Sequence, residues 1–116
     1  MKLYQMIGAG AVMMATWPDA RVQSLLETLG PNDRRSVRRL IDEARSSGIS
    51  WSEGSYVDGL SSVAAPVLDA EGCAVGAVLS YGPSYRFPKH GGRRKPEAAV
   101  SAAALAVADA LAGRPL

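Results

Sequence analysis

The sequence is poor in the residues that small proteins use for covalent or metal chemistry. Its 116 residues include one cysteine, Cys73, and one histidine, His90. A single cysteine cannot form an internal disulfide and fits a reducing compartment, and we expect Cys73 to be a small buried or half-buried side chain. Without a second histidine or cysteine at ligand spacing, we expect no zinc or iron site and no other cofactor. A Ser-His-Asp triad is also disfavoured, because no GxSxG segment is present.

Strong charge and long apolar runs are absent as well. Thirteen basic residues face 11 acidic ones, a balance too even to predict nucleic-acid binding through this chain alone. The longest apolar stretch, residues 98–108, is too short to span a bilayer, and residues 1–6 lack the apolar core of a signal peptide. We therefore expect no membrane association and a cytoplasmic location. The length predicts a single domain over residues 1–116.

The stretch from residue 60 to residue 83 predicts a β-hairpin around which the rest of the chain is arranged. Two apolar runs, 60–68 and 73–81, flank a turn-forming Asp-Ala-Glu-Gly at 69–72. Both faces of the first run are apolar, so we expect helices to cover one face and a ligand pocket to lie on the other. Pro66 cannot donate a ladder hydrogen bond, which predicts a sheet edge or a bulge at that position.

Three helices are predicted before the hairpin. A helix of small residues covers 9–15, and a second helix begins after Trp17 with Pro18 at its first helical position. The third helix is capped by Asn32 or Asp33 and ends at Gly48. Its apolar residues recur at the spacing of one buried face.

An alanine-rich helix is predicted after the hairpin, from Pro96 to about Leu111. A helix so uniformly apolar is normally buried on more than one side, either within one chain or against a second subunit. With a short strand at 49–52, the chain predicts an α+β fold whose sheet is largely antiparallel, with helices packed on it.

The Gly8-Ala9-Gly10 segment has three interpretations. It matches two of the three glycines of a dinucleotide-binding turn, but Met13 stands where the third is expected. The glycines could instead begin a helix that packs closely on a sheet. A third possibility is that exposed N–H groups at this helix start hold an anion that is not a nucleotide.

Five arginines lie along the third predicted helix. Asp42 and Glu43 follow Arg38 and Arg39 by four residues, the spacing of ion pairs on one helix face. We therefore expect a solvated, salt-bridged face and not a nucleic-acid surface. The remaining arginines of this face are Arg34, Arg35 and Arg45.

Two polar segments flank the hairpin. Residues 53–59 form a loop with two glycines and with Glu53 and Asp58, and they could line a pocket. Residues 89–95, which include His90, form a basic segment that we expect to be mobile and exposed.

From about Ile7 to Gly113, the chain resembles the effector-binding domain of the IclR family of bacterial transcriptional regulators. The resemblance depends on the Gly-Ala-Gly helix start, the helix pair after Trp17, the apolar run 63–67 with Asp69 and Gly72, and Ser80-Tyr81-Gly82-Pro83 with Arg86. It implies a GAF-like or profilin-like sensor fold. Family members also carry an N-terminal DNA-binding helix-turn-helix, to which we expect nothing in this sequence to correspond.

The resemblance also implies a ligand site. Backbone N–H groups at Gly8 and Ala9 match those that hold a small carboxylate in relatives, whereas Ser52, Leu79 and Tyr81 replace polar or acidic residues there. Leu79 and Tyr81 share a strand face and would form an apolar, partly aromatic wall. The implied ligand is an organic acid with an apolar or aromatic body, and we expect a homodimer or higher oligomer. Further implied pocket residues are Glu53, Leu60 and Ser62.

An enzyme that reuses this pocket for a metabolite is the alternative. Its acid–base candidates are Glu53, Tyr56, Tyr81 and His90.

Overall fold

A three-stranded antiparallel sheet forms the centre of the structure, which is a computed structural model describing residues 8–53, 59–88 and 92–113. The strand order is β1 (Ser50–Glu53), β2 (Leu60–Leu68), β3 (Ala74–Pro83). The described residues also form four helices around this sheet, so the predicted α+β fold class is confirmed.

The turn between β2 and β3 follows the sequence prediction. The Asp69 carboxylate accepts the backbone N–H groups of Glu71 and Cys73, each at 2.9 Å, and Gly72 has a φ of 82°. Such side-chain bonds to the backbone are the reason that aspartate favours turns. Because Cys73 belongs to this turn and not to β3, its side chain is exposed, so the prediction of a buried or half-buried cysteine is wrong.

Pro66 lies in the central strand of the sheet, opposite Ala77 of β3. The pairing with β1 covers only residues 61–64 of β2, so Pro66 lies beyond the end of the shorter neighbour. The register shifts between Val67 and Leu68, immediately after the proline. β2 is the central strand, but its second half has no β1 partner and contains a register shift next to Pro66. The prediction of an edge or a bulge therefore holds at the position of Pro66.

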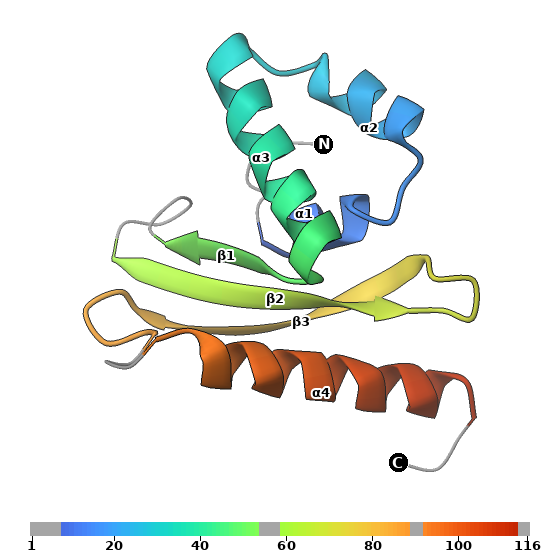
Figure 1. The fold of residues 1–116 in the computed structure, drawn as a ribbon, viewed down its shortest axis with the longest axis vertical. Coiled ribbons are helices and arrows are strands. Elements are labelled where there is room, and N and C mark those ends of the chain that lie inside the picture. The colour runs from blue at the N-terminus through green and yellow to red at the C-terminus, as the bar shows by residue number, and fades with distance from the viewer. Residues whose placement is uncertain (1–7, 54–58, 89–91, 114–116) are drawn as a thin grey trace.

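Helices cover both faces of the sheet (Figure 1). On one face, Ala64 packs with Val12 of α1 (Ala9–Met14) and Ala44 of α3 (Pro31–Ser47). On the other face, Val63, Ala65 and Val67 pack with Val100 and Ala104 of α4 (Arg94–Leu111). The expectation that helices would cover one face only is therefore wrong, because alternate residues of β2 are apolar in both directions.

The helix α2 (Asp19–Leu26) lies outside the sheet and packs on α3 (Figure 1). The apolar cluster between α1, α2 and α3 is fully buried, as the helical spacing predicts. It consists of Met14, Val22, Leu26, Val37 and Ile41.

The helix ends differ from the predictions by one to three residues. Pro18 has a ψ of 143° and is the N-cap of α2, not its first helical residue. Gly30 is the N-cap of α3 and Pro31 is its first residue, so neither Asn32 nor Asp33 caps it. Proline suits the first helical position because its φ is already helical and no hydrogen bond is required of its nitrogen. Gly48 ends α3 in the left-handed conformation, as expected.

The last helix begins two residues earlier than predicted. α4 starts at Arg94, which places Pro96 third in the helix. A proline is tolerated there because the first four N–H groups of a helix have no intrahelical partner. None of the helices in the described ranges is long and apolar enough to cross a membrane.

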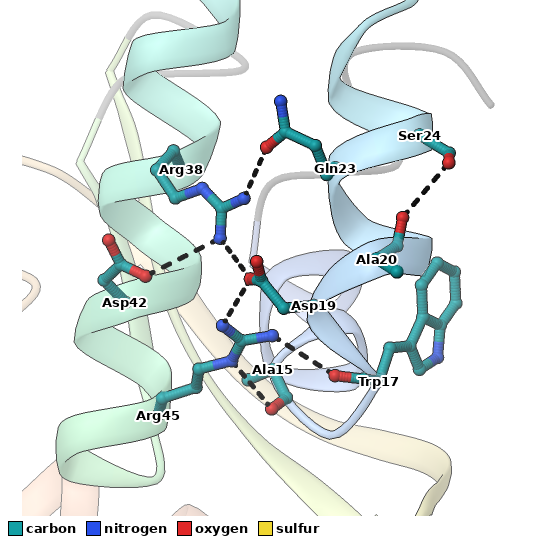
Figure 2. A network of polar contacts seen from close by, with 9 residues as sticks. All are labelled: Ala15, Trp17, Asp19, Ala20, Gln23, Ser24, Arg38, Asp42 and Arg45. Carbon is teal, nitrogen blue, oxygen red and sulfur yellow. Dashed lines mark hydrogen bonds and ion pairs between the residues drawn. The ribbon is translucent and has the colours of Figure 1, made fainter.

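The arginines of α3 do more than form a solvated face. The predicted pairs of Arg38 with Asp42 and of Arg39 with Glu43 are present, at 3.9 Å and 3.6 Å. Arg38 and Arg45, however, both reach across to Asp19 at the start of α2, at 2.9 Å and 3.1 Å (Figure 2). The arginines therefore connect α3 to the neighbouring helices.

Arg45 also joins α3 to the segment between α1 and α2. Its guanidinium donates to the backbone oxygens of Ala15 and Trp17, each at 3.2 Å (Figure 2). Hydrogen bonds from Arg38 and Arg45, followed by their charges, hold the pKa of Asp19 below its usual value. The carboxylate thus stays charged at neutral pH.

Candidate functional site

A row of three hydroxyl-bearing residues crosses the sheet on the side of α1. Ser52 of β1 is opposite Ser62 of β2, and Ser62 is opposite Tyr81 of β3. Directly opposed residues of antiparallel strands project to the same face, with Cβ atoms about 5 Å apart. The strand register therefore brings together three residues that the sequence separates by as many as 29 positions.

Gly8 lies next to this row, at the start of α1. Its φ of 64° lies in the left-handed region that favours glycine, and its carbonyl accepts the N–H of Val12 at 3.2 Å. A Cβ atom at this position would be 3.9 Å from the hydroxyl oxygen of Ser62. Ala9 follows as the first residue of the helix. The predicted Gly-Ala helix start and Ser62 are thus neighbours in the structure.

A second row lies beside the first and contains a residue that the sequence analysis did not select. Ser50 is opposite Ala64, and Ala64 is opposite Leu79. Ser50 is only 2% exposed, and its hydroxyl has no hydrogen-bond partner among the described residues. The signal for Ser50 was its alternation with Ser52, which places both serines on the same face of β1.

The predicted wall of the site is open to solvent. Leu79 and Tyr81 share a face, as predicted, but their exposed fractions are 46% and 71%. Leu60, at the start of β2, is half-buried and is opposite Pro83. The two rows therefore form one surface, with the buried Ser50 and Ser52 at its β1 end and the exposed ring of Tyr81 at its β3 end.

The remaining candidates lie at the limit of the described residues or outside them. Glu53 is opposite Ser61, one residue out of phase with the Ser52–Ser62 pair. Tyr56 and His90, which the enzyme interpretation invokes, lie outside the described residues, as does Asp58 of the predicted loop. Among the described residues, no group of three or more histidine, cysteine, aspartate or glutamate side chains could hold a metal ion.

A cavity of about 570 Å³ lies at the β1 edge of the sheet, between the end of α3 and the start of α4. Here the Trp51 indole donates to the Glu97 carboxylate at 2.6 Å, and the Arg93 guanidinium lies 4.9 Å from the indole ring centre. None of the residues predicted to bind a ligand lines this cavity. Sequence spacing could not reveal it, because Trp51 and Glu97 are 46 residues apart.

Comparison with known proteins identifies the family. The family model described as bacterial transcriptional regulator IclR, C-terminal, matches residues 1–109. The chain belongs to the IclR family. It corresponds to the C-terminal domain of such regulators, as the sequence resemblance predicted. No curated protein matches the sequence.

Solved structures share the fold of this IclR domain. A candidate transcriptional regulator from Rhodococcus sp. RHA1 is 25% identical with a TM-score of 0.80, and the match covers 97% of this chain and 49% of that one. An IclR homolog from Microbacterium sp. strain HM58-2 has a TM-score of 0.78 at 16% identity, covering 100% and 49%. An IclR regulator from Alicyclobacillus acidocaldarius has a TM-score of 0.74 at 22% identity, covering 90% and 44%. The chain thus spans about half the length of these relatives.

Proposed function

We propose that this chain is a small-molecule effector-binding domain of an IclR-type regulator, with its ligand on the α1 side of the sheet. The observation that carries this proposal is the row of Ser52, Ser62 and Tyr81 beside Gly8. Polar groups that converge at the junction of a helix start and a sheet are typical of small-molecule sites.

The chemistry of this surface favours an organic acid with an apolar or aromatic body. Serine and tyrosine hydroxyls can donate hydrogen bonds to a carboxylate, and Leu79 offers an apolar contact next to them. The ring of Tyr81, which is largely exposed in the free domain, can cover an apolar ligand and donate through its hydroxyl. The ligand should therefore be larger and less polar than a two-carbon or three-carbon acid.

Calorimetric titration with a panel of aromatic and aliphatic acids tests the proposal. We expect at least one acid to bind, and we expect Leu79→Glu to weaken that binding about tenfold or more, because a second carboxylate repels the acid. Leu105→Glu is the matched control, since Leu105 is 68% exposed on α4, on the other side of the sheet. If no acid in the panel bound at millimolar concentration, or if both variants bound like the unmodified domain, the proposal would be wrong.

We infer in addition that the domain forms a homodimer. Within the described ranges, β3 pairs only with β2, and its ten residues include no charged side chain. Natural edge strands normally carry charges that prevent pairing with another chain, so an uncharged edge favours association.

Sedimentation velocity tests this inference. We expect a dimer that Val75→Lys on β3 dissociates, while the matched Val107→Lys on α4 leaves it intact. Val75 and Val107 are both exposed, at 56% and 41%. A monomer at all concentrations, or equal dissociation in both variants, would contradict the role of the β3 edge.

A further inference from the structure

A cleft of about 330 Å³ lies between α2 and α3, away from the surface described above. Three of its six lining side chains are arginines, and none is a carboxylate. A concave site whose charges are all positive raises the local concentration of anions. The lining residues are Gln23, Leu26, Pro31, Arg34, Arg35 and Arg38.

Two of the arginines are held in place by the surrounding helices. Arg34 donates to the carbonyl oxygens of Leu26 and Leu29, at 3.2 Å and 3.0 Å. Arg38 donates to Asp19 and to the side chain of Gln23, each at 2.9 Å. Arginine side chains fixed by such contacts lose little further freedom when they bind a ligand.

The third arginine, Arg35, is exposed and forms no side-chain hydrogen bond or ion pair within the described part of the chain. An arginine has five N–H donors in a planar fork, a geometry that matches phosphate and carboxylate oxygens. Its guanidinium is therefore available to a ligand in the cleft.

The orientation of Gln23 adds a neutral donor. Because arginine can only donate, the side-chain oxygen of Gln23 must face Arg38, and the amide nitrogen must face the other way. Figure 2 shows this nitrogen pointing away from Arg38, and it donates no hydrogen bond within the described part of the chain. The contact with Arg38 thus fixes Gln23 as a hydrogen-bond donor on the α2 side of the cleft.

The start of α3 adds positive potential to the same place. Pro31, the first residue of this 17-residue helix, lines the cleft, so the positive end of the helix dipole lies beside the arginines. Two nearby carboxylates, Asp19 at 2.9 Å and Asp42 at 3.9 Å, offset the charge of Arg38. The charges of Arg34 and Arg35 have no such carboxylate partner among the described ion pairs.

We propose that this cleft binds a phosphate-type oxyanion, either free phosphate or the phosphate group of a small ester. Arg35, Arg34 and the amide nitrogen of Gln23 are the donors, and Arg38 orients Gln23 without needing to contact the anion. Leu26 and Pro31 supply an apolar margin that suits the organic part of an ester. This site is separate from the proposed effector surface, which lies between α1 and the sheet.

Calorimetry at low ionic strength with inorganic phosphate, and separately with glycerol 3-phosphate, tests the proposal. Gln23→Glu keeps the oxygen that Arg38 needs but replaces the donor with a negative charge, so we expect it to lower the affinity more than tenfold. Arg35→Gln should lower it about tenfold, because one charged donor is lost. Circular dichroism should show that both variants keep the helical content of the unmodified domain.

Arg39→Gln is the matched control. Arg39 lies on the same helix and its loss changes the net charge equally, but its side chain pairs with Glu43 and does not line the cleft. We expect its phosphate affinity to stay within about twofold of the unmodified domain. Equal affinities for the two ligands would identify free phosphate as the ligand, and tighter binding of the ester would identify an ester.

Three outcomes would overturn the proposal. The first is that neither compound binds at millimolar concentration. The second is that Arg39→Gln weakens binding as much as Arg35→Gln. This result would show that the loss of affinity comes from the net charge of the domain and not from the cleft. The third is that Gln23→Glu, with its helices intact, binds phosphate as well as the unmodified domain. None of these results depends on whether an organic acid binds at the α1 side of the sheet.

Discussion

The two faces of β2 are buried by different means. On the α4 side, Val63, Ala65 and Val67 pack with apolar side chains that include Val100 and Ala104, and the Trp51–Glu97 hydrogen bond lies beside them. On the α1 side, Ala64 meets α1 and α3, and behind them the arginines of α3 connect three segments of chain. One face depends on close packing, and the other adds directional polar contacts.

Apolar burial and polar contacts therefore have different effects on this domain: burial contributes most of the stability, and the polar contacts orient the helices. Ion pairs at exposed positions contribute about 0–1 kcal/mol each, whereas burial of one large apolar side chain contributes about 1.5–3 kcal/mol. The arginine contacts specify how α1, α2 and α3 lie relative to one another, because their geometry is directional. The apolar cluster beneath them should supply most of the stability of that side.

The largest effect should come from the apolar cluster between the first three helices. Ile41 is fully buried there, so Ile41→Ala should lower the free energy of unfolding by about 2–5 kcal/mol, through lost burial and a residual cavity. Urea unfolding followed by circular dichroism measures the change. Leu105→Ala, at a position 68% exposed, should change stability by less than about 0.5 kcal/mol. If Ile41→Ala and Leu105→Ala lowered the free energy of unfolding equally, the apolar cluster would not be the main source of stability.

A smaller effect should come from the polar contact of the α4 side. Trp51→Phe keeps an aromatic ring near Phe87, whose ring centre lies 5.8 Å from that of Trp51, but removes the donor to Glu97. We expect a loss of about 1 kcal/mol in unfolding free energy. Glu97→Gln, which keeps an acceptor oxygen, should lose less. If Trp51→Phe cost as much as Ile41→Ala, the α4 side would depend on its hydrogen bond and not on packing.

The smallest effect should come from Asp19, and it should depend on pH. The folded-state pKa of Asp19 lies below its usual 3.8, so its contribution is present above that value and is lost as the pH falls through the folded pKa. Asp19→Asn should therefore be slightly less stable than the unmodified domain at neutral pH. The two proteins should converge under strongly acidic conditions.

Thermal unfolding of both proteins across the acidic range measures this convergence. A stability difference between them that stayed constant with pH would show that the carboxylate charge is not the cause. If Asp19→Asn lowered stability at neutral pH more than Ile41→Ala does, polar contacts would contribute more to stability than apolar packing.

Part of the candidate site could be predicted from the sequence because it depends on local rules. Alternation along a strand placed Leu79 and Tyr81 on one face, and the small residues after Gly8 predicted the helix that begins at Ala9. Alternation with Ser52 gives the strand face of Ser50, but Ser50 was missed because alternation does not show whether a serine on that face is buried. The opening of the Leu79–Tyr81 surface to solvent was missed for the same reason: exposure depends on which elements lie nearby.

The sequence by itself determined the family, the α+β class and the approximate bounds of the elements, because periodicity, turn residues and helix ends are properties of short segments. Only the tertiary structure decided that helices cover both faces of the sheet and that Asp19 joins two arginines 19 and 26 residues away. It also formed the cleft between α2 and α3, where side chains from two helices meet. Contacts between distant residues follow from how the elements pack, and that packing is set by the summed burial of many side chains at once, which no single segment encodes.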